Sequence, residues 1–285
     1  SYEQINHCRT FLAAHLKQNK DAIYGINTGF GDLCNVKVSN EQLEKLQENL
    51  VMSHGCGWGN KVPKTIIRKM VLLKLASLSK GHSGISQSTF DKLLELYNLN
   101  ILPVIYTQGS LGASGDLAPL AHMSLSLLGH GEVYYNDEEV SAKSLIEKGI
   151  YAPISLQSKE GLALLNGTQF MQSYLQECTS KALKQLDLAQ KIGALSIVAF
   201  NANKSPFHPA IQKIRNNEGQ IKIAAEILDL LSDYEPEDLG VSVQDPYSFR
   251  CIPQVHGTAY AQLQYACDHL EKELNSVTDN PLIFP

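Results

Sequence analysis

The stretch Gly109-Ser-Leu-Gly-Ala-Ser-Gly-Asp-Leu-Ala-Pro-Leu-Ala-His122 joins a run of small residues to the start of a helix. Ala113, Ser114 and Gly115 form its centre, Asp116 follows, and Pro119 stands where the first turn of a helix is expected. The simplest interpretation is a glycine-rich connection in which Asp116 caps that helix. The same residues also permit chemistry, because a sharp bend at glycine would let the amide nitrogen of Gly115 attack the carbonyl of Ala113.

Such a cyclisation would make the backbone itself an electrophile. The hydroxyl of Ser114 can leave as water and give an exocyclic methylene, and Asp116 is a ready acid or base. The partial positive charge at a helix N-terminus would polarise the ring further.

The rest of the chain predicts a mainly α fold, a long antiparallel helical bundle with only short strands. Apolar residues recur at helical spacing in six segments, which are residues 40–59, 63–80, 86–98, 168–200, 219–232 and 255–274. The second half of the longest one, residues 192–200, is apolar nearly all round, as in the middle of a bundle. Strands are expected only at 133–135 and 152–156. We expect an N-terminal region over 1–165 that carries the functional loops, and the start of a central helical bundle over 166–285.

Composition excludes several classes of function. The 285 residues are 44% hydrophobic and 19% charged, as in an ordinary soluble protein, and the formal net charge of −5 argues against nucleic acid or an anionic membrane as the main partner. No apolar run is long enough to span a bilayer and the N-terminus does not look like a signal peptide, so a cytoplasmic location is expected. The six cysteines and nine histidines show no metal-ligand spacing, so no metal site is expected.

Two further loops contain candidate functional residues. Tyr24-Gly-Ile-Asn-Thr-Gly-Phe-Gly31 is either an ordinary flexible loop or a mobile lid that brings Tyr24 over a substrate. His54 closes a predicted helix and precedes a glycine-rich segment; it is either a simple helix-end contact or a pocket residue.

Polar residues near the two later helices complete the set. Asn166 comes before the long helix and is expected to cap it, to contact a substrate, or both. In Gln244-Asp-Pro-Tyr-Ser-Phe-Arg-Cys-Ile-Pro-Gln254, Arg250 offers a planar fork that matches a carboxylate, and Tyr247 would share its face in a helix. A surface arginine beside a proline turn is the alternative.

In their order along the chain, these blocks resemble the aromatic amino acid ammonia-lyase and aminomutase family. The resemblance rests on Gly112-Ala-Ser-Gly-Asp-Leu-Ala-Pro-Leu-Ala-His122, the Tyr24 loop, Ser53-His54, Asn166-Gly167, Gln244-Asp-Pro-Tyr-Ser-Phe-Arg250 and Asn275-Ser-Val-Thr-Asp-Asn-Pro-Leu-Ile-Phe284. It implies that Ala113, Ser114 and Gly115 cyclise autocatalytically into 4-methylideneimidazol-5-one (MIO), with Asp116 taking part in ring formation and no external cofactor.

The resemblance also implies roles for the other residues. Tyr24 or Tyr247 would accept a proton from the substrate, and Arg250 would hold its carboxylate. His54 would contact the substrate side chain, with Asn166 and Gln244 in the pocket. The last block, residues 275–284, is given a structural role.

For the reaction, the resemblance implies deamination of L-histidine to trans-urocanate and ammonia, because Ser53-His54 is similar to the pair in histidine-specific members. Some tyrosine-acting relatives share this pair, so a tyrosine ammonia-lyase, an aromatic aminomutase or an inactive helical scaffold remain alternatives. Family members are homotetramers with active sites shared between subunits. The family's further pocket residues would follow residue 285, so the chain is expected to be a fragment with little activity alone.

Overall fold

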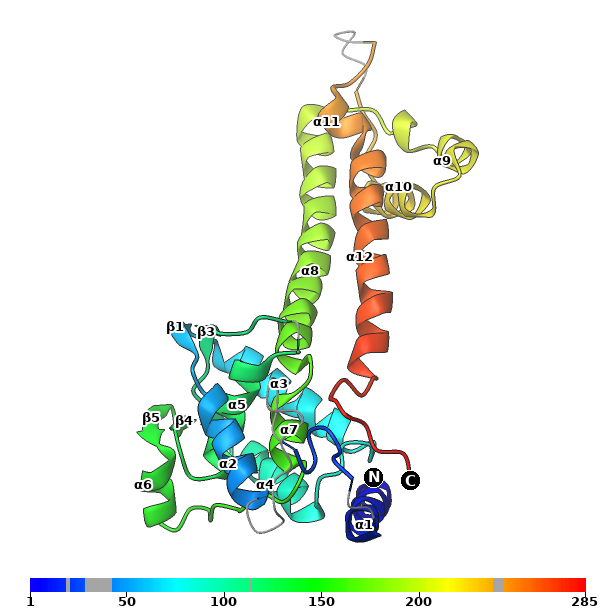
Figure 1. Ribbon diagram of the computed structural model, residues 1–285. Coiled ribbons are helices and arrows are strands. Elements are labelled where there is room, and N and C mark those ends of the chain that lie inside the picture. Colours follow the sequence, from blue (N-terminus) through cyan, green and yellow to red (C-terminus); the bar gives the residue numbers. More distant parts are fainter. Residues whose placement is uncertain (19–20, 29–42, 113, 238–242) are drawn as a thin grey trace. The chain divides into compact units, whose positions relative to one another are not determined.

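The computed structural model describes residues 1–18, 21–28, 43–112, 114–237 and 243–285 (Figure 1). The chain forms two compact units. The first consists of Ser1–Tyr174 together with Glu273–Pro285, and the second of Leu175–Lys272. The second unit is therefore an insertion within the first. The domain division expected between residues 165 and 166 stays a prediction.

Helices build most of the first unit. They are α1 (Tyr2–Gln18), α2 (Leu43–His54), α3 (Lys64–Leu78), α4 (Gln87–Asn98), α5 (Leu117–Leu127), α6 (Ala142–Glu147), α7 (Glu160–Leu165) and the first turns of α8 (Gln169–Phe200). The core contains Met70 of α3, Leu120 and Met123 of α5 and Leu164 of α7, all fully buried. Helix α3 follows Pro63 and ends before Gly81, whose φ of +73° suits glycine, as its sequence predicted.

Short strands lie beside these helices. β1 (Trp58–Lys61) pairs antiparallel with β3 (Tyr106–Gln108), and a second antiparallel sheet has the order β2 (Leu102–Pro103), β4 (Glu132–Tyr135), β5 (Glu138–Ser141). The strand expected at 133–135 is confirmed as part of β4. The strand expected at 152–156 is wrong: Pro153 has no N–H to donate, and the N–H of Ile154 donates to Leu127 at the end of α5, 3.0 Å away.

The second unit contains most of α8, the 3₁₀ turn η3 (Ser205–Phe207), α9 (Pro209–Arg215), α10 (Glu218–Leu230), α11 (Tyr247–Arg250) and most of α12 (Ile252–Leu274). Its core joins Ile197 of α8, Phe207, Ile223 and Ile227 of α10, and Ile252 of α12. Helices α10 and α12 approach so closely that a Cβ built on Gly219 would lie 2.2 Å from the Gly257 carbonyl oxygen.

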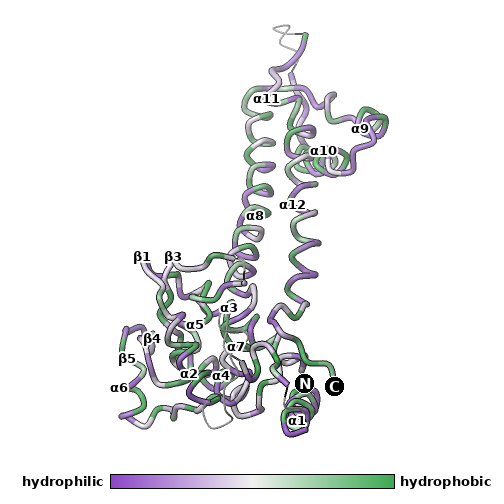
Figure 2. Tube along the Cα trace, in the orientation of Figure 1, coloured by the Kyte–Doolittle hydropathy of each residue, from purple (hydrophilic) through white to green (hydrophobic). Residues whose placement is uncertain are grey.

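Apolar side chains on α8 remain exposed. Leu195 is 70% exposed, and Ile192 and Phe200 are 53% exposed each, although Ala194 and Ile197 between them are buried. Apolar and polar residues alternate along both α8 and α12 (Figure 2). The helix expected over 168–200 and the mainly α fold are confirmed.

Within the described ranges, none of the helices combines the length and the apolar character needed to cross a bilayer. The same part of the chain contains no group of three or more His, Cys, Asp or Glu side chains that could hold a metal ion.

Candidate active site

A cavity of about 580 Å³ in the first unit brings together five of the residues singled out from the sequence. They come from four separate segments and are Tyr24, His54, Ser114, Gly115 and Asn166. Apolar side chains, among them Leu50 of α2 and Leu165 of α7, complete the wall. Concave, partly apolar sites with a few convergent polar groups are typical of small-molecule binding.

The backbone bends sharply at Gly115. Its φ is +85°, and a Cβ built there would lie 2.4 Å from the carbonyl oxygen of Gly167. That oxygen accepts a hydrogen bond from the N–H of Asp116 at 2.7 Å, so residues 115–116 lie directly against Gly167. Only glycine fits at position 115, in agreement with the bend inferred from the sequence. Ala113 lies outside the described residues.

Asn166 touches the same turn through its side chain. The amide Nδ2 donates to the carbonyl oxygen of Ser114 at 2.9 Å. The backbone of Asn166 ends α7, and its own carbonyl oxygen accepts a hydrogen bond from the buried Lys74 at 2.7 Å. Asn166 therefore connects the Ser114 backbone to α7 and α3 by hydrogen bonds.

Asp116 is completely buried next to the turn. Its carboxylate does not cap α5, the helix that follows it. Instead, one oxygen accepts from Ser110 Oγ and the other from the N–H of Met171 in the first turn of α8, both at 2.9 Å. Burial raises the pKa of the Asp116 carboxyl, while the hydrogen bonds from Met171 and Ser110 oppose that shift. The Asp116 carboxyl therefore keeps its proton up to a higher pH than an exposed aspartate does.

Tyr24 begins a tight turn whose other residues are buried. Asn27 closes that turn by accepting from the N–H of Ile23 at 2.7 Å and donating to the Asp21 carbonyl oxygen at 2.9 Å. Tyr24 itself is 44% exposed and lines the cavity. The rest of the expected lid, residues 29–31, lies outside the described residues.

His54 is the last residue of α2. Its Nδ1 lies 2.9 Å from the carbonyl oxygen of Leu50 and 3.1 Å from Ser53 Oγ. Because a carbonyl oxygen only accepts, the contact with Leu50 assigns the proton to Nδ1. In the neutral ring, Nε2 then carries the lone pair and can accept a hydrogen bond. The helix-end contact and the pocket position, which the sequence left as alternatives, are thus combined in one residue.

The segment after α12 also lines the cavity. Thr278 and Asn280 belong to the wall, and Thr278 Oγ1 accepts from the N–H of Thr168 and from Gln169 Nε2. The sequence assigned residues 275–284 a structural role only. The alternation of Thr278, Asp279 and Asn280 was a signal that could have revealed these residues, because neighbours in an extended segment point to opposite sides.

The sequence also assigned no role to His122, whose contact lies close to the site. Its Nε2 accepts from the N–H of Gly57 at 2.9 Å, so it fixes the loop that follows His54. Burial lowers the pKa of His122, which favours the neutral ring that this acceptor role requires.

The remaining candidates belong to the second unit. Gln244 and Arg250 line a cavity of about 410 Å³ there. Helix α11 confirms the helical spacing expected for Tyr247 and Arg250, whose guanidinium lies 4.0 Å from the centre of the Tyr247 ring. Arg250 Nε donates to the Asp245 carbonyl oxygen at 3.1 Å, and Tyr247 is 70% exposed. The planar guanidinium is thereby held by stacking and one hydrogen bond.

The chain belongs to the aromatic amino acid lyase family, whose family model matches residues 1–285. It is 43% identical over 283 residues to a histidine ammonia-lyase of Streptococcus pyogenes serotype M6, covering 99% of this chain and 55% of the relative. A histidine ammonia-lyase of Streptococcus sanguinis is 44% identical over 268 residues, with coverages of 93% and 52%. The chain thus spans about half the length of the curated relatives it matches.

Solved structures agree on the fold. Phenylalanine aminomutase from Pantoea agglomerans superimposes with a TM-score of 0.94 at 31% identity, over 99% of this chain and 58% of its own. Histidine ammonia-lyase from Trypanosoma cruzi gives a TM-score of 0.89 at 36% identity, over 99% and 53%. The mainly helical fold is therefore shared by ammonia-lyases and aminomutases.

Proposed function

We propose that the complete protein deaminates L-histidine to trans-urocanate and ammonia, with an MIO group formed from Ala113, Ser114 and Gly115. The observation that carries the proposal is the cavity in which Ser114 and Gly115 meet Tyr24, His54 and Asn166. The 43% identity to a histidine ammonia-lyase supports histidine as the substrate.

The residues present fit this prosthetic group. Ring closure joins the Gly115 nitrogen to the Ala113 carbonyl carbon, and the carbonyl oxygen leaves as water with the N–H hydrogens of Gly115 and Ser114. A second water forms from the Ser114 hydroxyl and the hydrogen on the Ser114 Cα. The sharp bend at Gly115, with its φ of +85°, favours this closure. Buried Asp116, with its raised pKa, is suited to move the protons.

When formed, the group supplies an electrophile that takes the substrate amine and makes it a better leaving group. Side chains of this chain would bind the substrate and move its proton. Arg250 pairs with the substrate carboxylate through its planar fork. Nε2 of His54 accepts from the N–H of the substrate imidazole, since Nδ1 already donates to Leu50. Tyr24 or Tyr247 takes the β-proton, and Gln244 contributes to the pocket.

The proposed enzyme is a cytoplasmic homotetramer with shared active sites. The exposed apolar side chains on α8, including Ile192, Leu195 and Phe200, support assembly with further helices. They provide the unsatisfied apolar surface that an oligomer would bury.

The decisive experiment follows urocanate absorbance from L-histidine with the complete protein, and chromatography of parallel reactions with L-tyrosine and L-phenylalanine. Urocanate is the expected main product. If cinnamate-type or β-amino acid products dominate instead, the substrate is tyrosine or phenylalanine and not histidine. Intact mass must lie two waters below the encoded mass. Ser114→Ala is expected to fold normally, to have the mass encoded by its sequence and to be inactive. Full activity in this variant would refute the assignment of Ser114 to the prosthetic group.

A further inference from the structure

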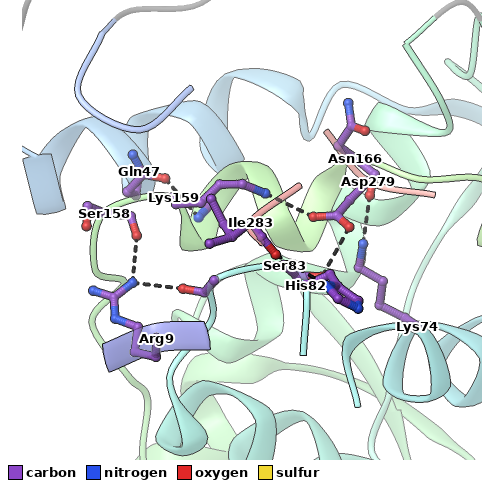
Figure 3. A network of polar contacts seen from close by, with 12 residues as sticks. Arg9, Gln47, Lys74, His82, Ser83, Ser158, Lys159, Asn166, Asp279 and Ile283 are labelled. Carbon is purple, nitrogen blue, oxygen red and sulfur yellow. Dashed lines mark hydrogen bonds and ion pairs between the residues drawn. The ribbon is translucent and has the colours of Figure 1, made fainter. Parts of the chain in front are cut away.

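Lys74 is a lysine on α3 that no step of the proposed reaction uses. It is only 1% exposed and lies among core residues of the first unit. Its Nζ donates to the carbonyl oxygen of Asn166 at 2.7 Å (Figure 3). Burying an ammonium is costly unless it is well paired, so this position calls for an explanation.

Lys159 is a second fully buried lysine among the described residues, and its surroundings differ from those of Lys74. Lys159 forms an ion pair with Asp279 at 2.9 Å, and Ser83 donates to the same carboxylate (Figure 3). Across the described residues, Lys74 has no carboxylate within ion-pair distance, and its Nζ donates instead to the backbone carbonyl oxygen of Asn166. Burial lowers the pKa of Lys74 to about 8, so the side chain still carries its proton at neutral pH. The ammonium is therefore kept at a cost to stability that an apolar side chain would avoid.

The contact of Lys74 acts on the turn at Gly115 through Asn166. The side-chain amide of Asn166 donates to the Ser114 carbonyl oxygen at 2.9 Å, and the next residue, Gly167, accepts from the N–H of Asp116 at 2.7 Å. The peptide that Lys74 holds thus lies between two hydrogen bonds to the turn. A change in its orientation would move both.

The bond to the Ser114 carbonyl oxygen matters for the second dehydration of ring formation. In that step the Cα–H bond of Ser114 breaks as its Cβ–O bond breaks, and the two fragments leave as water. Negative charge develops on the Ser114 carbonyl oxygen as the α-hydrogen departs, and a donor already in place stabilises it. Asn166 is that donor, and Lys74 fixes the peptide from which it extends.

We propose that Lys74 is a positioning residue for formation of the MIO group, acting through Asn166 on the Ser114 carbonyl oxygen. This inference rests on the proposed function. It predicts that Lys74 is required for cyclisation and not for the stability of the fold.

The test measures the fraction of folded, purified full-length protein whose mass is two waters below the encoded value, together with the thermal midpoint. Lys74→Met keeps the length of the side chain but removes the ammonium, and Lys74→Arg keeps charge and donor. We expect Lys74→Met to lower the ring-containing fraction by about tenfold or more, since misplaced groups slow such steps strongly, without lowering the thermal midpoint. Lys74→Arg is expected to recover part of the fraction. Lys159→Met is the matched control, with a lower thermal midpoint and a complete ring in the folded protein.

Each outcome has one meaning. If the parent carries the ring and Lys74→Met carries it to the same extent, the inference is wrong and the proposed function stands. If Lys74→Met and Lys159→Met both lose ring only in proportion to lost stability, Lys74 has a structural role and the inference is equally wrong. If the parent protein has its unmodified mass, no ring has formed. The proposed function is then wrong, and so is the role of Lys74 that rests on it. Should Lys74→Met not fold, Lys74→Gln, which is neutral and shorter, carries the same expectation.

Discussion

Gly115 shows how one residue type determines what the candidate site can do. Its positive φ and the 2.4 Å between a built Cβ and the Gly167 carbonyl oxygen leave no room for a side chain. The obstacle is backbone and cannot rotate away. The turn therefore depends on glycine twice, for its conformation and for the close approach of residues 166–168.

We expect Gly115→Ala to abolish ring formation and to reduce activity by at least about a hundredfold, because the clash displaces the reacting atoms. Intact mass and urocanate absorbance measure the two effects. Gly149→Ala is the matched control, since Gly149 has a similar φ of +69° but nothing within 4 Å of a built Cβ. It should lose about 1–2 kcal/mol of stability from the left-handed backbone and retain the ring. A normal ring in Gly115→Ala would contradict the assignment.

His122 predicts a pH dependence of stability. Burial lowers its folded-state pKa below the ordinary 6.5, so the unfolded chain binds more protons between these two values. Stability is therefore lost as the pH falls from 6.5 through the lowered pKa, and Gly57 loses its acceptor. His122→Gln keeps an acceptor that does not titrate in this range, so we expect a shallower loss on acidification. Urea denaturation at several pH values measures the difference; identical slopes for parent and variant would exclude this role. His256, also with a pKa lowered by burial, contributes equally to both proteins.

At the scale of elements, the packing of α10 on α12 depends on two glycines. A Cβ on Gly257 would lie 2.5 Å from the Gln220 nitrogen and 2.6 Å from its Cα. These atoms belong to a helix backbone, so the helices would have to separate. In contrast, a Cβ on Gly193 of α8 would meet only the tip of the Ile252 side chain at 3.1 Å.

Gly257→Ala is therefore expected to destabilise the second unit by roughly 3 kcal/mol, the upper range for overpacking. Gly193→Ala should be neutral or stabilising by up to about 1 kcal/mol, because alanine is the better helix former. Urea denaturation followed by far-ultraviolet circular dichroism compares the two. Equal stabilities for both variants would mean that α10 and α12 do not pack as closely as described.

The elements also show what the sequence could predict. Helices such as α3 and α8 follow from apolar periodicity and from local stop signals, which act within a few residues. The strand expected at 152–156 fails because the N–H of Ile154 donates to the end of α5, a contact remote in sequence. In the candidate site, Ser114, His54 and Asn166 belong to short sequence motifs whose residue types already indicate chemistry. The roles of Lys74 and His122 emerge only from tertiary contacts, which residue type alone does not encode.

At the scale of the whole molecule, the first unit is held together by polar contacts between distant segments. Lys159 and Asp279, both buried, pair at 2.9 Å. Arg9 of α1 donates to the carbonyl oxygens of Gly84 and Ser158, and the N–H of Ile283 donates to the carbonyl oxygen of His82. The end of the described chain thus packs into the unit formed by its beginning.

Removing one partner of the Lys159–Asp279 ion pair should strongly lower the stability of the fold. Asp279→Leu leaves an unpaired buried ammonium, and we expect a loss of about 3–5 kcal/mol in the free energy of unfolding. The double variant Lys159→Met/Asp279→Leu should recover most of that loss, because it removes both charges. Guanidinium denaturation of the parent, the two single variants and the double variant completes the cycle. Additive losses in the double variant would show that the two groups do not interact.

The discontinuous first unit also has a consequence for synthesis. A ribosome makes residues 1–174 before residues 175–272, and the segment with Asp279 after both. Throughout that interval the nascent first unit has Lys159 without its carboxylate and the cavity without the wall of Thr278 and Asn280. Its final packing, and with it the surroundings of Ser114, is therefore completed only after translation has passed the inserted unit.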